Sequence, residues 1–175
     1  LISILKNEKF DLIHLDGLYV SSYTEIIRQN SDAKIVYRAH NVEYLICERM
    51  ANNAFFGPKK FYLNILSLQL KEYEQQQLNK FDLVVAITHQ DEVLLKKIGC
   101  KAPVIVSPAG LELEKYEPDF SQMEFPSLFH LGGLDWMPNQ EGIIWFLKNV
   151  WNEIHKEFFQ LKFYIAGRNM PKWLS

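Results

Sequence analysis

Histidines are the residues of this sequence that are best suited to acid–base chemistry near neutral pH. His40 is the candidate among them, because it follows an apolar segment and stands beside Asn41, with Glu43 close by. A histidine in such a place can bind a hydroxyl group or shuttle a proton. The alternative is that His40 and Asn41 cap the helix that follows, and the residue types alone do not decide between the two interpretations.

Paired glycines form a second candidate site. Gly132 and Gly133 close an apolar segment a few residues before a helical pattern. Backbone N–H groups there can approach a diphosphate, whose negative charge the helix dipole favours, although a tight strand-to-helix turn is the simpler explanation. No GxGxxG or GxxxxGK[ST] motif follows any apolar segment, which disfavours dinucleotide and P-loop functions. An unrelated nucleotide-binding Rossmann protein would need a phosphate loop elsewhere.

A metal site is not expected. The five histidines are spread singly, without a pair at metal-ligand spacing such as HExxH. The two cysteines, Cys47 and Cys100, suggest neither a redox pair nor a zinc site. They favour a reducing, cytoplasmic setting.

Six short apolar runs predict the strands that position these residues. They are near-continuous rather than alternating, which is typical of strands covered by helices on both faces. Helical patterns lie between most of them, so we expect an α/β fold with a Rossmann-like, doubly wound parallel sheet and flanking helices. The predicted strands are Asp11–Leu15, Ile35–Arg38, Leu83–Ile87, Val104–Ser107, Ser127–Leu131 and Leu161–Ile165.

Three helices have clear sequence patterns. The first spans Lys59–Asn79, the second residues 89–98 with a capping box from Thr88 to Asp91, and the third Pro138–Lys156. Apolar residues at three- and four-residue spacing predict the apolar face of the first helix: Phe61, Ile65, Leu66, Leu70 and Tyr73. The buried stripe predicted for the third is Ile143, Phe146, Leu147, Val150, Trp151 and Ile154.

Ligands of open parallel sheets bind beyond the carboxyl ends of the strands. Polar residues and glycines gather at these ends in the sequence: Asp16-Gly17, His40-Asn41, Thr88-His89, Ser107-Pro108, Gly132-Gly133 and Gly167-Arg168.

The segment after the fourth strand has the composition of a linker, with Pro108, Gly110 and Pro118 and no useful apolar period. We assign residues 1–107 to one domain, 108–125 to the linker and 126–175 to the start of a second domain. Two strands cannot bury both faces of a sheet. We therefore expect the second unit to pack on the first, on a partner chain or on a rearranged edge, and the chain to self-associate.

Composition disfavours nucleic acid as a partner and a membrane-spanning segment. The net charge of -2, with basic residues scattered along the chain, disfavours nucleic acid. The most apolar long stretch, Phe61–Leu70, is shorter than the ~20 residues of a membrane span, so no span is expected and only peripheral membrane association is left open. The chain starts at Leu1 without a signal pattern, and we expect both ends to be cuts through a longer protein.

Three stretches together resemble glycosyltransferase family 4, whose members have the two-domain GT-B fold. Their order and spacing agree with the family from about Ile35 to Arg168, which implies the end of an amino domain and the start of a carboxyl domain of a bacterial enzyme. The stretches are VYRAHNVEYLICERMA, then FDLVVAIT with APVIVSPAGLELEKYEP, and finally LFHLGGLDWMPNQEGIIWFLKNVW with LKFYIAGR.

The resemblance implies transfer of a sugar from a nucleotide-diphosphate donor to the hydroxyl of a glycan or lipid-linked acceptor. Retention of anomeric configuration, a role in surface polysaccharide or glycoconjugate synthesis, and independence of metal cofactors are implied as well. By matching positions, His40 would contact the transferring sugar as the catalytic residue. The donor would meet Gly132, Gly133, Asn139 and Arg168, while Asp16, Gly17, Asn41 and Glu43 would bind the acceptor or order its loop.

Some positions depart from the family pattern. Many relatives carry Arg and Lys after the first strand of the donor domain, whereas residues 135–139 contain no cation, and Ala109 and Glu112 replace the usual Asn and Asp. The chain also ends before the region of the family's paired glutamates. We therefore expect negligible transferase activity from this chain alone, and a noncatalytic α/β binding or assembly module is the alternative.

Overall fold

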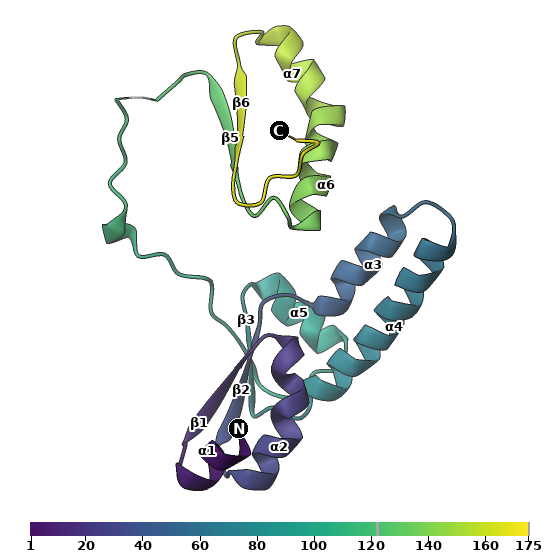
Figure 1. Cartoon of the computed structure of the whole chain (residues 1–175), viewed down its shortest axis with the longest axis vertical. Coiled ribbons are helices and arrows are strands. Elements are labelled where there is room, and N and C mark those ends of the chain that lie inside the picture. The colour runs from purple at the N-terminus through teal and green to yellow at the C-terminus, as the bar shows by residue number, and fades with distance from the viewer. Residues whose placement is uncertain (122, 175) are drawn as a thin grey trace. The chain divides into compact units, whose positions relative to one another are not determined.

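The computed structural model describes residues 1–121 and 123–174, which form two compact units. Unit 1 spans Leu1–Leu111 and unit 2 spans Glu112–Ser175. Figure 1 shows a sheet with helices in each of them. Between the fourth and fifth strands the chain forms one short 3-10 helix, η2 (Leu113–Lys115).

The sheet of unit 1 is entirely parallel, with the strand order β1-β2-β3-β4. The four strands predicted for this part of the chain are confirmed to within one residue at each end. They are β1 (Leu12–Asp16), β2 (Lys34–Ala39), β3 (Leu83–Ala86) and β4 (Val104–Val106).

Helices cover one face of this sheet. Leu15, Tyr37 and Val84 share a face of the sheet and belong to one buried cluster. Each α-helix of unit 1 contributes a residue to this cluster: Leu5, Ile27, Tyr44, Leu78 and Leu95. Leu12 and Ile105 lie on the opposite face and are exposed. The prediction of a doubly wound sheet covered on both faces is therefore wrong for the described residues, because right-handed crossovers that never reverse direction place their helices on one side. The helices are α1 (Ile2–Asn7), α2 (Thr24–Asn30), α3 (Glu43–Asn53), α4 (Pro58–Leu78) and α5 (His89–Lys97), with a 3-10 helix η1 (Leu18–Tyr23) before α2.

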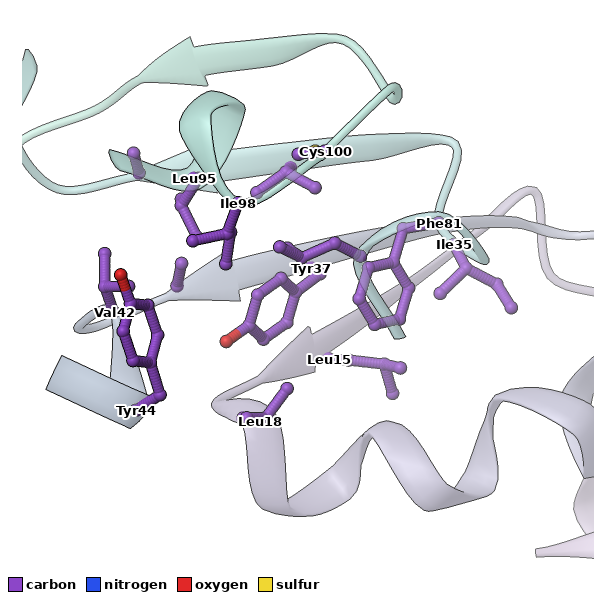
Figure 2. Close-up of a cluster of buried hydrophobic side chains, with 14 of the residues drawn as sticks. Leu15, Leu18, Ile35, Tyr37, Val42, Tyr44, Phe81, Leu95, Ile98 and Cys100 are labelled. Atoms are coloured by element: carbon purple, nitrogen blue, oxygen red, sulfur yellow. The ribbon is translucent and has the colours of Figure 1, made fainter. Parts of the chain in front are cut away.

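The core of unit 1 is organised around Tyr37 in the central part of the sheet (Figure 2). Its ring stacks on Phe81 with centroids 4.8 Å apart. Leu95 and Ile98 reach the cluster from α5 and the residue that follows it, and Leu18 reaches it from η1. Sheet and helices are therefore joined by one continuous apolar core, and the ends of the strands are held in register by it.

The predicted apolar face of α4 is confirmed in part, since Leu70 and Tyr73 are partly buried against the core of unit 1, but it is wrong at the amino end of the helix. Phe61, assigned to the apolar face, is 69% exposed and Ile65 is also exposed, whereas Leu63 is 7% exposed. The residues that α4 buries are Leu63, Ser67, Glu74, Gln77 and Leu78. The apolar period was a misleading guide here, because the buried stripe contains polar side chains with specific partners on α3.

Unit 2 is a parallel pair of strands, β5 (Ser127–Leu131) and β6 (Lys162–Ala166), as predicted. The connecting helix runs through α6 (Met137–Phe146), a wider π-helical turn, η3 (Leu147–Trp151), and α7 (Asn152–Glu157). Phe146 packs against Phe163 with ring centroids 4.9 Å apart. Phe129 and Leu131 point to the other face and are exposed, so this sheet buries one face only.

The orientation of α4 generates a paired test. We expect Leu63→Ala to lower the free energy of unfolding by about 2–4 kcal/mol, because it leaves a cavity beneath α4. Phe61→Ala should change it by less than about 0.5 kcal/mol, because the ring is largely solvent-exposed. Urea unfolding followed by far-UV circular dichroism measures both. A larger loss in Phe61→Ala than in Leu63→Ala would contradict the observed orientation.

Candidate functional site

The carboxyl edge of the unit 1 sheet brings two predicted site residues together. Asp16 ends β1, and His40 follows β2, its parallel neighbour. The His40 Nε2 atom lies 2.6 Å from the Asp16 Oδ1 atom, and both side chains remain accessible to solvent. Each residue was predicted for this edge, but the hydrogen bond between them was not.

This hydrogen bond determines which nitrogen of His40 is available. An ionised carboxylate only accepts, so the Nε2–H group donates to Asp16, and the Nδ1 atom of the neutral ring is left as an acceptor. Helix α3 begins at Glu43 with Val42 as its N-cap and has no side-chain cap. The interpretation of His40 and Asn41 as helix caps is therefore wrong, and no described residue is hydrogen-bonded to the Nδ1 atom of His40.

Gly17 shapes the turn that carries Asp16. Its φ angle is 92°, a conformation that favours glycine, and its N–H group donates to the Arg38 carbonyl over 3.1 Å. A Cβ atom at this position would lie 2.5 Å from the Tyr19 ring. The placement of Gly17 gives it a role in directing the chain out of β1.

A buried carboxylate on α4 holds the start of α3. The Glu74 Oε1 atom accepts from the Glu43 N–H group over 3.0 Å, and Oε2 accepts from Tyr44 N–H over 3.1 Å. Glu74 is fully buried. It therefore satisfies two of the N–H groups that the uncapped helix leaves open, and it anchors the chain three residues beyond His40.

Glu74 was not among the predicted site residues. An acidic residue four positions after Leu70, on a stripe that also holds Ser67, is the signal that could have revealed it. It was missed because a glutamate is rarely expected in a fully buried position. Gln77, three residues further along α4, is buried as well, whereas its neighbours Gln75 and Gln76 are exposed.

Burial raises the pKa of Glu74 to about 7, although its two backbone hydrogen bonds act in the opposite direction. The nearby Glu43 carboxylate adds to the increase. Burial, followed by the charges of Glu74 and Glu43, also raises the pKa of Tyr37 far above its usual range. The buried Tyr37 hydroxyl has no hydrogen-bond partner among the described residues. A carboxyl group behind the His40 loop therefore changes its charge near neutral pH.

Asn41 lines a small polar pocket of about 230 Å³ beside this loop. Its walls come from the segment 41–49 and from α5 with its N-cap, where the predicted capping box is confirmed in part. Thr88 Oγ1 accepts from Asp91 N–H over 3.0 Å, and the Asp91 carboxylate accepts from the Thr88 hydroxyl over 2.7 Å instead of from the Thr88 backbone. Arg49 supplies the positive charge of the pocket. The lining residues are Asn41, Val42, Leu45, Ile46, Arg49, Thr88, Gln90, Asp91 and Leu94.

In unit 2, three of the predicted donor residues line one pocket of about 320 Å³. They are Gly133, Asn139 and Arg168, and the other two lining residues are Asp135 and Trp136. Neither of these two was predicted for the site, although both belong to the loop 135–139, which contains no cation. Arg168 is the only cation among residues 132–139 and 167–170.

The two loops of this pocket are joined by hydrogen bonds. Gly132 N–H donates to the Ala166 carbonyl over 3.2 Å and Leu134 N–H to the Arg168 carbonyl over 2.9 Å. The Gly132 amide is therefore used within the fold, as in a tight turn, whereas no described residue accepts from Gly133 N–H. A role for either glycine in donor binding stays a prediction.

Asp135 reduces the positive charge of this pocket. A hydrogen bond from Asn169 lowers the pKa of the Asp135 carboxyl group, and the charge of Arg168 contributes to the same shift. Asn139 is directed to the Gly133 carbonyl, to which its Nδ2 group donates over 2.9 Å. The pocket thus offers one backbone amide and one guanidinium to an anion, with a carboxylate beside them.

Among residues 1–121 and 123–174, no three His, Cys, Asp or Glu side chains gather closely enough to hold a metal ion. Within the same ranges, no helix combines the length and the apolarity that crossing a membrane requires.

A parallel sheet with flanking helices and polar groups at its carboxyl edge defines unit 1 as a Rossmann-like α/β domain. The sequence profile of Glycosyltransferase Family 4 matches residues 1–115. The chain therefore belongs to glycosyltransferase family 4, which confirms the resemblance, and the family acts on a sugar donor and an acceptor. No curated protein and no solved structure matches the chain.

Glu74 generates a prediction about pH. Its carboxyl group loses its proton near 4.5 in the unfolded chain but near 7 in the folded one. Between these values the folded state binds more protons, so the contribution of Glu74 to the free energy of unfolding falls as pH rises, by about 1–3 kcal/mol. Relative to Glu74→Gln, which cannot titrate, the native protein should lose this amount between pH 5 and pH 7.5, by the standard linkage relation.

Urea unfolding at a series of pH values, followed by circular dichroism, measures this difference. All four tryptophans lie in unit 2, so their fluorescence reports that unit separately. Glu72→Gln, an exposed change on the same helix, is the control and should show no such slope. A native-minus-Gln difference that does not vary with pH would exclude the buried titration.

Proposed function

We propose that this protein transfers a sugar from a nucleotide-diphosphate donor to an acceptor hydroxyl. Family membership supplies the general reaction class. The observation that carries the proposal further is the hydrogen bond between His40 and Asp16 at the carboxyl edge of a parallel sheet. This edge is the usual place for small-ligand chemistry in such folds.

In this proposal His40 is the catalytic residue. Asp16 fixes the imidazole ring, and the Nδ1 atom accepts a hydrogen bond from a hydroxyl group of the transferring sugar. The negative charge of Asp16 would also stabilise an imidazolium if a proton moves to the ring. Asp16, Gly17 and Asn41 lie on the acceptor side, and Glu43 orders the loop through its backbone bond to Glu74.

The donor diphosphate is proposed to bind at the unit 2 pocket. Gly133 N–H and the Arg168 guanidinium would stabilise the charge that develops on the leaving group, without a metal ion. Because Asp135 opposes this charge, we expect the 175-residue chain alone to turn over donor very slowly. Retention of anomeric configuration, a bacterial polysaccharide or glycoconjugate product and a cytoplasmic location are proposed from the family resemblance.

A noncatalytic binding or assembly module is the second candidate. The observation in its favour is the loop 132–139, which has a carboxylate, Asp135, and no cation where a diphosphate should bind. This candidate differs from the first in predicting no saturable binding of nucleotide diphosphates.

Substitution of His40 tests the proposed chemistry. We expect His40→Ala to reduce sugar transfer by about 10²–10⁴-fold, because it removes the hydrogen-bonding group nearest the reacting sugar. Affinity for the nucleotide diphosphate should change little, because the phosphates are proposed to bind unit 2. Transfer assays with nucleotide sugars and calorimetric titration of nucleotide diphosphates, on the protein at its full natural length and on this chain, measure both quantities.

His14→Ala is the matched control, because His14 is an exposed histidine on β1 that takes no part in the site. Asp16→Asn should retain part of the activity with a shifted pH profile, since the ring loses a charged partner but not a hydrogen-bond acceptor. Undiminished transfer in His40→Ala would refute the role of His40. Absence of nucleotide binding by the full-length protein would favour the noncatalytic module.

A further inference from the structure

The turn between α3 and α4 exposes aromatic side chains to an unusual degree. Phe55 is 96% exposed and Phe56 is 100% exposed. Phe61 and Tyr62, in the first two turns of α4, are exposed as well. Figure 1 shows this turn at the end of the α3–α4 hairpin that points away from the sheet of unit 1. We define the hairpin tip as Phe55, Phe56, Lys59, Lys60, Phe61 and Tyr62.

An apolar stripe continues from the hairpin tip along α4. Ile65 and Leu68 are exposed and follow Phe61 at four- and seven-residue spacing, so the three share one side of the helix. The opposite side already packs on α3 through Leu63 and Ser67, since Ser67 Oγ donates to the Tyr44 carbonyl over 3.4 Å. The stripe is therefore additional to the core, and it remains uncovered within unit 1.

Positive charge accompanies these apolar residues. Between Arg49 and Lys71 the chain carries Arg49, Lys59, Lys60 and Lys71 but no Asp or Glu, although its overall net charge is -2. Lys59 and Lys60 make no ion pair with any described residue. The stretch 49–71 is thus basic, although Glu43, Glu48, Glu72 and Glu74 balance these charges over the α3–α4 hairpin as a whole. At the hairpin tip itself, Lys59 and Lys60 are available to an external partner.

We propose that the hairpin tip binds an anionic lipid surface. Exposed aromatic rings partition into the boundary between headgroups and acyl chains, and lysines beside them are attracted by anionic headgroups. The attraction grows with the number of basic residues near such a surface. This inference extends beyond the proposed reaction and does not depend on it, since lipid binding is measured without donor or acceptor.

The shape and the composition of the tip favour a lipid surface over a protein. The tip is a projecting turn rather than a groove, and an interface of standard size takes about 20–30 residues from each partner, far more than the tip and its stripe provide. Lysine is depleted in protein interfaces, whereas aromatic and basic residues together are typical of segments that lie in a membrane interface.

Co-sedimentation with lipid vesicles tests the proposal. The chain should bind vesicles of phosphatidylcholine mixed with phosphatidylglycerol, and binding should weaken as salt is added, because the lysine contribution is screened. Phe55→Ser with Phe56→Ser should reduce partitioning at least tenfold. Lys59→Glu with Lys60→Glu should reduce it at least as much on the mixed vesicles and remove the difference between these and pure phosphatidylcholine.

Matched controls have the same chemistry elsewhere in unit 1. Tyr19→Ser removes another exposed aromatic ring, and Lys6→Glu with Lys9→Glu reverses two exposed lysines. Both should bind like the native chain, and circular dichroism should show the same helix content in all variants. Tip variants that bind vesicles as well as the native chain would overturn the proposal. So would a change in their oligomeric state without lipid, measured by sedimentation velocity, since the tip would then contact a second copy.

Discussion

The loop that carries His40 depends on the carboxylate of Glu74, which contacts the start of α3 and not the loop itself. Helix α3 has no cap of its own, and its first N–H groups are satisfied by Glu74 from the middle of α4. The fully buried carboxylate costs desolvation energy, which is why its pKa rises to about 7. The conformation of the loop is thus linked to the packing of α3 against α4. A change that separates these two helices would also release the chain next to His40.

The parallel sheet was predictable because each strand is a short apolar run bounded by polar or turn residues. The strand order was not predictable, since the direction of each crossover depends on the face of the sheet on which the connecting helix packs. That order decides that Leu12 and Ile105 lie on an exposed face. Helix α4 was predicted in extent, and its apolar face was predicted correctly at Leu70 and Tyr73. The prediction failed at Phe61 and Ile65, which have the period of a core stripe without lying in the core.

For the site, the strand-end rule located Asp16 and His40 at one edge, which the structure then joins by a hydrogen bond. The strand-end rule does not identify partners that are distant in the sequence. Glu74 lies 31 residues from the N–H group of Glu43 that it accepts from, and such a pairing follows only from the packing of two helices. Likewise, the sequence indicated Gly133 and Arg168 separately, while their common pocket with Asp135 and Trp136 depends on the pairing of β5 with β6.

The crossing of the two loops in unit 2 restricts how a binding site there can evolve. A Cβ atom on Gly167 would lie 1.7 Å from the Gly132 carbonyl oxygen, so the backbones touch with no side chain between them. Hydrogen bonds from Leu134 N–H to Arg168 and from Asn169 to Asp135 tie the same loops together. A substitution that shifts one loop must move the other, so ligand preference here would change through paired substitutions rather than single ones.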